Sequence, residues 1–509
     1  MRILIVVTLA VVMGACATTD PAIYSHSLQN CLSHLSAFKK EVRRQQVSDV
    51  QVVSHQAFPY LAFDRFSQSQ LAGIVTVKDR SQWLDYTAQL AARQRQAEFN
   101  NLVVNHFELP VLDHCASKLT EEAKHNDRVW SAIVQQEITI ADSYEPWLRV
   151  FGLYPISSQL AQSAIDKEKK RILLGFHVPE RSQPTVQYRL AQRPTETNLL
   201  ARATNTQTPR ANTTINQTQI EAWFNRALSD STLDWPMLSD SQVSQLHLHY
   251  APLIAVEQSS DIAFRPEDNI PGAVRYLPLE QKPAVDTSQP AIYLHHSYTR
   301  LYGKTYLQLN YSLWFANRTP TSLLDPYAGQ FDGVLLRLTL DHRGRPLLLD
   351  SIHHCGCYHM VFNLSENFTF ANAPPDIETP LLFERIVPSY DAMPPSWSVT
   401  LSHGEHMIKQ VDWHEQDPAT GAQTQALKPI DYDQLRQLPT NKQNTISLFD
   451  HRGLLPSSER LESTYLWPFG IPSAGATRQL GHHAIAFIGI RHFDQPRLFE
   501  QIVRPVNAP

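Results

Sequence analysis

The sequence predicts an α+β protein, in which an N-terminal helical domain precedes a C-terminal domain of antiparallel β-sheet. Two patterns lead to this prediction. Before residue 180, apolar side chains recur at helical spacing, as in Leu28, Leu32 and Leu35. After residue 243, short runs alternate apolar and polar residues and are separated by turn residues, which is typical of strands. A chain of 509 residues is long enough for two or three domains.

The helical domain is expected over residues 24–180. Helical spacing continues in the apolar stripe of Val129, Trp130 and Ile133. The segment that follows Pro146 is rich in aromatic residues up to Tyr154, which would suit contact with a membrane surface. We expect it to pack in the core instead, because helices usually bury such stripes.

Residues 181–242 are predicted to form a polar linker that contains one short amphipathic helix. The stretch 202–219 is rich in Thr, Asn and Gln, which favours a surface loop. Thr218 and Glu221 then match a capping box, in which a hydroxyl and a carboxylate satisfy the free amides of a helix start.

The β domain is expected over residues 243–509. Consecutive hairpins predict an antiparallel meander, and therefore a sandwich or an open barrel. In chain order the predicted elements are a strand around 246–250, hairpins over 291–315, 334–352 and 396–413, and a last strand over 484–490.

The first residues have the pattern of an export signal. Arg2 precedes an apolar run too short to span a bilayer permanently, and Gly14 and Ala15 end this run before Cys16. The arrangement resembles the lipobox of bacterial lipoproteins, which implies cleavage before Cys16 and lipidation of that residue. Residues 1–15 are therefore expected to be a signal peptide and residues 16–23 a lipidated tether. An ordinary secretory signal, cut elsewhere, is the alternative.

The expected location of the protein is the bacterial cell envelope. By resemblance to the bacterial sorting pattern, Ala17 favours the outer membrane, with the protein facing the periplasm. The expected partners are the membrane, through the N-terminal lipid, and other envelope proteins. Nucleic acid is not an expected partner, because the net charge is −5 and no long basic run occurs. The absence of a G-x-G-x-x-G or Walker-type motif argues against a nucleotide site.

The remaining four cysteines fall into two pairs. We predict a disulfide between Cys31 and Cys115, which would suit an oxidising compartment. Two buried thiols that never meet are the alternative. The second pair, Cys355 and Cys357, belongs to the densest group of chemically active residues in the chain, the run His353-His354-Cys355-Gly356-Cys357-Tyr358-His359.

On an extended strand, His353, Cys355, Cys357 and His359 would point the same way. Two thiolates and two imidazoles form the ligand set of many zinc sites, and zinc is favoured over copper and iron. Six residues of strand span about 20 Å, however, whereas the ligands of one ion lie within roughly 4 Å of one another.

Convergence on one ion therefore needs either a sharp bend at Gly356 or ligands from other parts of the chain. Among the other histidines we favour His483 and His492, which flank the predicted strand 484–490. Two alternatives stay open: Cys355 and Cys357 form a structural or redox-active disulfide, or the cluster is buried and hydrogen-bonded without a ligand.

Several stretches resemble those of proteobacterial envelope proteins. They are Ser143-Tyr144 with Leu153-Tyr154-Pro155, the HxCGCYH-type motif between Asp350 and His359, Trp467 to Ile471, and Gly481 through Asp494. The resemblance covers most of the mature chain and implies an envelope address, but it brings no catalytic residues with it. It supports one choice of site, namely His353, Cys355, Cys357, His359, His483 and His492.

The sequence therefore predicts an envelope lipoprotein that binds a metal ion or small ligand at this C-terminal His/Cys cluster, with hydrolysis as an added activity. A structural or assembly lipoprotein braced by its cysteines is one alternative. A thiol–disulfide protein that uses Cys355 and Cys357 is the other.

Overall fold

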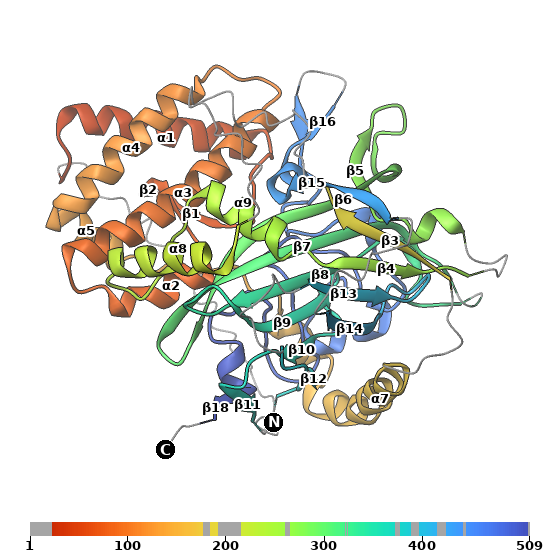
Figure 1. The fold of residues 1–509 in the computed structure, drawn as a ribbon. Helices are drawn as coiled ribbons and strands as arrows, with labels where there is room; N and C mark the ends of the chain where they lie inside the picture. Colours follow the sequence, from red (N-terminus) through yellow and green to blue (C-terminus); the bar gives the residue numbers. More distant parts are fainter. Residues whose placement is uncertain are drawn as a thin grey trace, which may run out of the picture.

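Helices occupy the N-terminal half of the chain and a large curled sheet its C-terminal part, as the computed structural model shows (Figure 1). The signal peptide, Cys16 and most of the tether lie outside the described residues. The structure describes residues 23–176, 184–191, 215–259, 265–320, 322, 324–371, 377–387, 396–414, 424–440 and 444–506.

Three long helices pack around a two-stranded sheet at the start of the described chain. These are α1 (His26–Arg44), α3 (Val77–Asn101) and α4 (Leu109–His125), and the strands are β1 (Val53–His55) and β2 (Phe58–Phe63). Their shared core buries Phe38, Tyr60, Trp83 and Leu119 completely. A disulfide between Cys31 and Cys115 joins α1 to α4, as the sequence predicts.

One further long helix, α7, and several shorter ones complete the helical elements of the described residues. They are α2 (Arg65–Gln70), η2 (Leu71–Gly73), α5 (Asp127–Val134), α6 (Pro146–Phe151), α7 (Tyr154–Gly175), α8 (Gln217–Asp230), α9 (Asp240–His249), η4 (Pro266–Asn269), η5 (Tyr432–Arg436), η6 (Pro456–Ser458), α10 (Ser463–Leu466), η7 (Trp467–Phe469) and η8 (Phe499–Gln501). Helix α7 lies apart from α1–α5, on the other side of the sheet (Figure 1).

The large sheet has twelve strands. They are β3 (Thr185–Leu190), β4 (Leu253–Glu257), β5 (Gly272–Leu277), β6 (Lys282–Leu301), β7 (Lys304–Arg318), β8 (Gly329–Leu340), β9 (Pro346–His353), β10 (Met360–Asn363), β12 (Leu381–Glu384), β13 (Ser396–Leu401), β14 (Ile408–His414) and β15 (Thr424–Asp431). Two small antiparallel sheets pair β11 (Phe368–Phe370) with β18 (Val503–Pro505) and β16 (Leu438–Pro439) with β17 (Thr445–Ile446).

The large sheet is mixed, so the prediction of a purely antiparallel domain is wrong. Its order is β12-β10-β9-β8-β7-β6-β15-β3-β4-β13-β14, with β5 paired to β6. Strands β6 to β9 form the predicted meander of antiparallel hairpins, and β10, which was not predicted, pairs antiparallel with β9. Strand β15, however, lies parallel to both β6 and β3, and β4–β13 and β10–β12 are also parallel. Parallel neighbours are joined by long connections, which local sequence patterns do not reveal.

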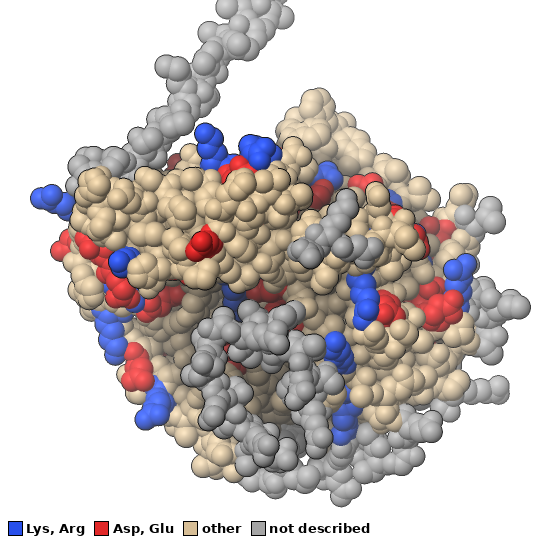
Figure 2. All heavy atoms as spheres, turned by 90° about the horizontal axis from the view of Figure 1, so that it is seen from above, with Lys and Arg blue, Asp and Glu red and all other residues tan. Residues whose placement is uncertain are grey.

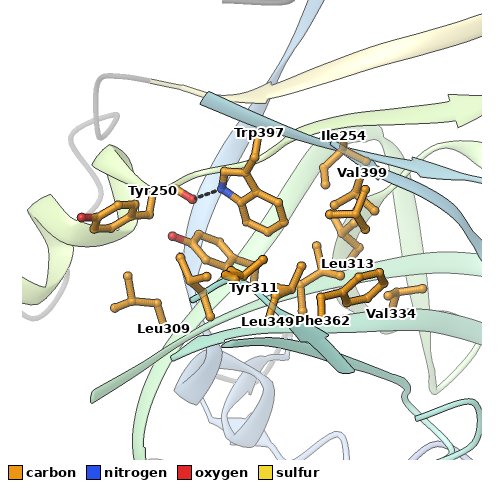
Figure 3. Close-up of a cluster of buried hydrophobic side chains, with 14 of the residues drawn as sticks. Tyr250, Ile254, Leu309, Tyr311, Leu313, Val334, Leu349, Phe362, Trp397 and Val399 are labelled. Carbon is orange, nitrogen blue, oxygen red and sulfur yellow. Dashed lines mark hydrogen bonds between the residues drawn. The ribbon is translucent and has the colours of Figure 1, made fainter. Parts of the chain in front are cut away.

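The main core lies between two facing limbs of the curled sheet (Figure 3). Ile254 and Val399, from β4 and β13, face Leu313 and Phe362 from β7 and β10, and these side chains are fully buried or nearly so. The indole of Trp397 donates a hydrogen bond of 2.7 Å to the Tyr250 carbonyl at the edge of this core. The curl therefore lets one sheet bury its own apolar face.

Two predicted strands are absent from their expected places. Residues 246–250 belong to the end of helix α9 and the residue after it, because the Ser239 side chain caps the Gln242 amide and Val243 and Leu246 share a buried helical face. Residues 484–490 form an irregular loop instead of a strand. The Phe487 amide of this loop donates to the Glu378 carboxylate, and its Gly489 carbonyl accepts from Arg149. Side chains therefore make the hydrogen bonds that a neighbouring strand would make in a sheet.

Acidic and basic side chains alternate over the surface in the view of Figure 2, and neither sign forms a continuous field there. Among the described residues, no helix is both long enough and apolar enough to cross a bilayer.

Candidate dithiol and ligand site

The predicted His/Cys cluster forms a tight turn between strands β9 and β10. The His353 amide donates to the Cys357 carbonyl at 3.0 Å, and the Gly356 amide donates to the His353 carbonyl at 2.8 Å. Gly356 has a φ of +94°, and a Cβ atom at this position would lie 2.2 Å from the Ala484 carbonyl oxygen. Only glycine fits there. The cluster therefore bends at Gly356, one of the two options that the sequence leaves open.

The turn holds Cys355 and Cys357 as two neighbouring free thiols. The Cys357 amide donates to Cys355 Sγ at 3.4 Å, and the two thiol groups also hydrogen-bond to each other. This hydrogen bond lowers the pKa of Cys355, whereas the same bond and burial raise the pKa of Cys357 well above its ordinary value. Cys355 is therefore the thiol that ionises first, and a thiolate is the reactive form of cysteine.

A buried carboxyl group, Glu462, accompanies the thiols. Burial raises its pKa to about 7, although the nearby guanidinium groups of Arg460 and Arg318 oppose the shift. Glu462 contributes a negative charge that raises the pKa of both thiols. A Cβ atom on Gly475 would lie 2.1 Å from Glu462 Oε1, so the position of this carboxyl depends on a glycine. A carboxyl with a pKa near 7 can exchange protons at neutral pH.

The thiols and Glu462 line one cavity of about 240 Å³. Helix α7 forms one wall with Ile165 and Ile172, and Phe469 and Ile471 contribute from the C-terminal region. The cavity is thus mostly apolar, with a few polar groups in its wall, which is the usual character of a small-ligand site.

An aspartate lies near each of His353 and His359, but only His359 is hydrogen-bonded to one. His353 Nδ1 lies 3.8 Å from Asp332 Oδ1, which is too long for a hydrogen bond. His359 Nε2 lies 3.1 Å from Asp350 Oδ2, and Asp350 also accepts two hydrogen bonds from Arg337. Burial lowers the pKa of both histidines, that of His359 to about 4, so both imidazoles are neutral near pH 7.

The two distant histidines have other surroundings. His492 Nε2 lies 2.8 Å from Asp142 Oδ1, and its ring packs edge-on against Tyr144. His483 is buried, and its ring centroid lies 6.2 Å from that of Phe493. Burial lowers the pKa of His483 well below its ordinary value.

The described residues give no support to a single metal site built from the six predicted ligands. Within the described part of the chain, no group of three or more His, Cys, Asp or Glu side chains is arranged to hold a metal ion. The carboxylates of Asp350 and Asp142 bind Nε2 of His359 and Nε2 of His492, and a carboxylate on one ring nitrogen leaves the other able to ligate a metal. Zinc therefore remains a prediction for which these residues provide no ligand set.

Sequence reasoning missed Arg460 and Glu462, two residues that surround the turn. Arg460 interacts with Asp332, which also accepts a hydrogen bond of 2.7 Å from the completely buried His406. Although burial opposes the shift, His353 and His406 hold the pKa of Asp332 well below its usual range. Glu462 follows the motif by about a hundred positions, and no local pattern marks it. The nearest signal is Gly475, whose lack of a side chain leaves room for the carboxyl.

A larger and more polar cavity, of about 550 Å³, lies where the N-terminal helices meet strands β6 and β7. His295 and His296 line it, as does Arg65, which is paired with Asp494 at 3.1 Å. It contains no cysteine, so of these two cavities the smaller is the one with thiols.

The chain matches no family model, no curated protein and no solved structure, so its own geometry carries the functional inference.

Proposed function

We propose that the protein carries out thiol–disulfide exchange at Cys355 and Cys357, on a small and largely apolar thiol or disulfide that enters the 240 Å³ cavity. The observation that supports this most strongly is geometric: a tight turn holds two free thiols side by side in the cavity wall, with the Cys357 amide donating to Cys355 Sγ at 3.4 Å. The pKa of Cys355 is lowered and that of Cys357 is raised. Such a pair has one thiol ready to attack and a second to resolve the intermediate.

In the reductive direction, the Cys355 thiolate attacks one sulfur of a substrate disulfide. A bond forms between Cys355 Sγ and this sulfur, the substrate S–S bond breaks, and the leaving thiolate takes a proton from the Glu462 carboxyl. Cys357 then gives its proton to the Glu462 carboxylate and attacks Cys355 Sγ, which expels the second substrate sulfur as a thiolate. The cysteine pair loses two electrons and the substrate gains two. In the opposite direction, the oxidised pair converts two substrate thiols into a disulfide.

The test is a redox titration of the full-length protein against reduced and oxidised glutathione, followed by alkylation and peptide mass spectrometry. We expect Cys355 and Cys357 to convert reversibly between a dithiol and an internal disulfide, and both single serine variants to lose this conversion. The Cys31–Cys115 disulfide is the internal control, since it should stay oxidised throughout. A pair that stays reduced at every glutathione ratio would contradict the proposal.

Metal binding makes a different prediction for the same residues. Elemental analysis of protein purified without a metal-affinity tag is expected to find no stoichiometric zinc. Stoichiometric zinc that disappears in Cys355→Ser would replace the redox proposal with the metal-site prediction, because zinc binding keeps thiolates from forming a disulfide.

We further propose that the protein is a lipid-anchored component of the bacterial envelope, on the strength of the signal ending at Cys16. Mass spectrometry of the mature N-terminus is expected to find Cys16 as the first residue, carrying acyl chains. A mature chain that begins elsewhere and lacks lipid would contradict this address.

A further inference from the structure

Helices α6 and α7 present a row of large apolar side chains to solvent, although the sequence predicts that this segment is buried. Leu148 and Tyr144 do point inward. The residues between and after them are far more exposed than a core segment allows, with exposed fractions of 57% for Trp147, 73% for Val150, 74% for Phe151, 63% for Leu153, 59% for Ile156 and 75% for Leu160. We call these six residues the α6–α7 face.

The α6–α7 face is held in place by polar contacts behind it. Arg149 donates to the carbonyls of Phe469 and Gly489, at 2.8 and 2.6 Å, and its guanidinium packs on the ring of Tyr154. The Tyr154 hydroxyl accepts from the Gly489 amide at 2.9 Å. The apolar side chains are therefore displayed on an ordered surface. Contiguous exposed apolar patches on an ordered surface usually mark an interaction site.

Helix α7 has two unlike sides. Ile165 and Ile172 line the cavity on its inner side. On its outer side, at 3.6 residues per turn, Ile156 and Leu160 fall in line with the exposed residues Lys167, Lys170 and Leu174. Apolar residues and lysines on one helix face, with tryptophan nearby, are the composition of helices that lie in the plane of a membrane surface.

We propose that the α6–α7 face lies in the headgroup region of a bilayer that contains anionic lipids. The charge of the helix selects this occupant, because Lys167 and Lys170 are exposed beside the apolar row and outnumber the exposed Asp166. Arg171 is exposed too, but it is paired with Glu168 and Glu405. A second copy of the chain, related by a two-fold axis, would bring the same lysines towards this face and would repel. The contact does not require the lipid on Cys16, and it does not depend on the thiol chemistry.

The test uses full-length protein bound to phosphatidylcholine vesicles that contain phosphatidylglycerol and a trace of a phospholipid with a photoactivatable group near its headgroup. After illumination, peptide mass spectrometry locates the labelled residues. We expect labels on peptides that span 147–160, in addition to any on the N-terminal segment. Labels confined to residues 1–22, or as frequent at the exposed Leu279 as on the α6–α7 face, would overturn the proposal.

Matched variants separate the face from general hydrophobicity. The triple variant Val150→Ser, Phe151→Ser and Leu160→Ser is expected to lower labelling of 147–160 about tenfold or more, since three apolar side chains leave the membrane surface. The control variant, Val75→Ser with Leu279→Ser, removes two even more exposed apolar residues elsewhere and should leave labelling unchanged. Unchanged melting temperatures in both variants are expected, because none of these side chains is buried. A triple variant that melts much earlier while keeping its labels would assign the face a structural role.

Two further experiments test the role of the lysines and the possibility of self-association. Lys167→Glu with Lys170→Glu should lower labelling on phosphatidylglycerol vesicles and have little effect on pure phosphatidylcholine. An equal loss of labelling on both vesicle types would overturn the claim that the α6–α7 face prefers anionic lipids. Sedimentation of the protein without vesicles is expected to show no association through this face. A dimer that the triple variant abolishes would assign the face to a second copy instead of a bilayer.

Discussion

The two cysteine pairs of this chain occupy opposite settings. Cys31 and Cys115 are 84 positions apart, yet helix packing brings their Cα atoms to 4.9 Å and a disulfide joins them. Cys355 and Cys357 are two positions apart, yet they remain free thiols in the wall of a cavity. The comparison teaches that the first pair constrains the fold. A disulfide between Cys355 and Cys357 would close a loop too short to restrict the unfolded chain strongly. This pair therefore serves the reactivity of the site and contributes little to the stability of the fold.

The largest expected effect separates the two pairs by stability. Replacing Cys31 and Cys115 by serine should lower the free energy of unfolding by roughly 4 kcal/mol, because the disulfide closes a long loop in the unfolded chain. Replacing Cys355 and Cys357 by serine should change it by less than about 1 kcal/mol. Urea unfolding of both double variants measures the difference. Equal losses would favour the alternative in which both pairs brace the fold.

The carboxyl group beside the second pair should give the fold a pH dependence. Burial raises the pKa of Glu462 to about 7 from its ordinary 4.5, so between these values the folded protein keeps a proton that the unfolded chain releases. Stability is lost as the pH rises through this window. Glu462→Gln removes the loss, and should therefore stabilise the protein at pH 8, relative to pH 5, by up to about 3 kcal/mol. Urea unfolding of variant and wild type at both pH values tests this. A difference that does not change with pH would show that Glu462 is not buried in its ionised form.

Within the second pair, the two thiols should differ in reactivity. Limiting iodoacetamide at pH 8 is expected to modify Cys355 about tenfold more often than Cys357, because the pKa of Cys355 is lowered and that of Cys357 is raised. Fragment mass spectra of the wild-type peptide locate the label without disturbing the hydrogen bond between the thiols. Equal labelling would remove the main support for the assigned roles.

The smallest expected effect concerns the charge of Glu462. At pH 8 this carboxylate raises the pKa of Cys355, so Glu462→Gln should speed alkylation of Cys355 by a factor of about two to five. The exposed Glu459 supplies the matched control, since Glu459→Gln removes an equal charge from the same segment. If both variants act alike, the effect comes from net charge and not from the cavity.

Local patterns predicted the parts of the fold that are local. The meander from β6 to β9 followed from turns such as Tyr302-Gly303, which reverse the chain between alternating runs. The parallel pairing of β15 with β3 and β6 could not be predicted in this way, because the partners are distant in sequence. Helix α9 was mistaken for a strand because five residues are too few to distinguish the two periods.

At the candidate site, too, local sequence patterns predicted only the features that are local in the chain. Cys355 and Cys357 were recognised, and a bend at Gly356 was one of two stated options, since these residues lie in one short run. The zinc prediction required distant histidines to gather around the thiols, and the described residues show His359 and His492 bound to two different aspartates, Asp350 and Asp142. Asp142 and Glu462 come from other parts of the chain. Their protonation depends on burial, which a sequence without a fold does not specify.

Helix α7 separates the thiol cavity from the surroundings with one layer of side chains on each of its sides. Ile165 and Ile172 line the cavity that contains the thiols, and Ile156 and Leu160 face outward from the same helix. Because a helix shifts or tilts largely as a unit, displacement of its outer surface also displaces the cavity wall. A partner that binds the outer face of α7 and shifts the helix must therefore change the affinity of the cavity for its ligand. By linkage, the ligand must change the affinity for that partner by the same factor.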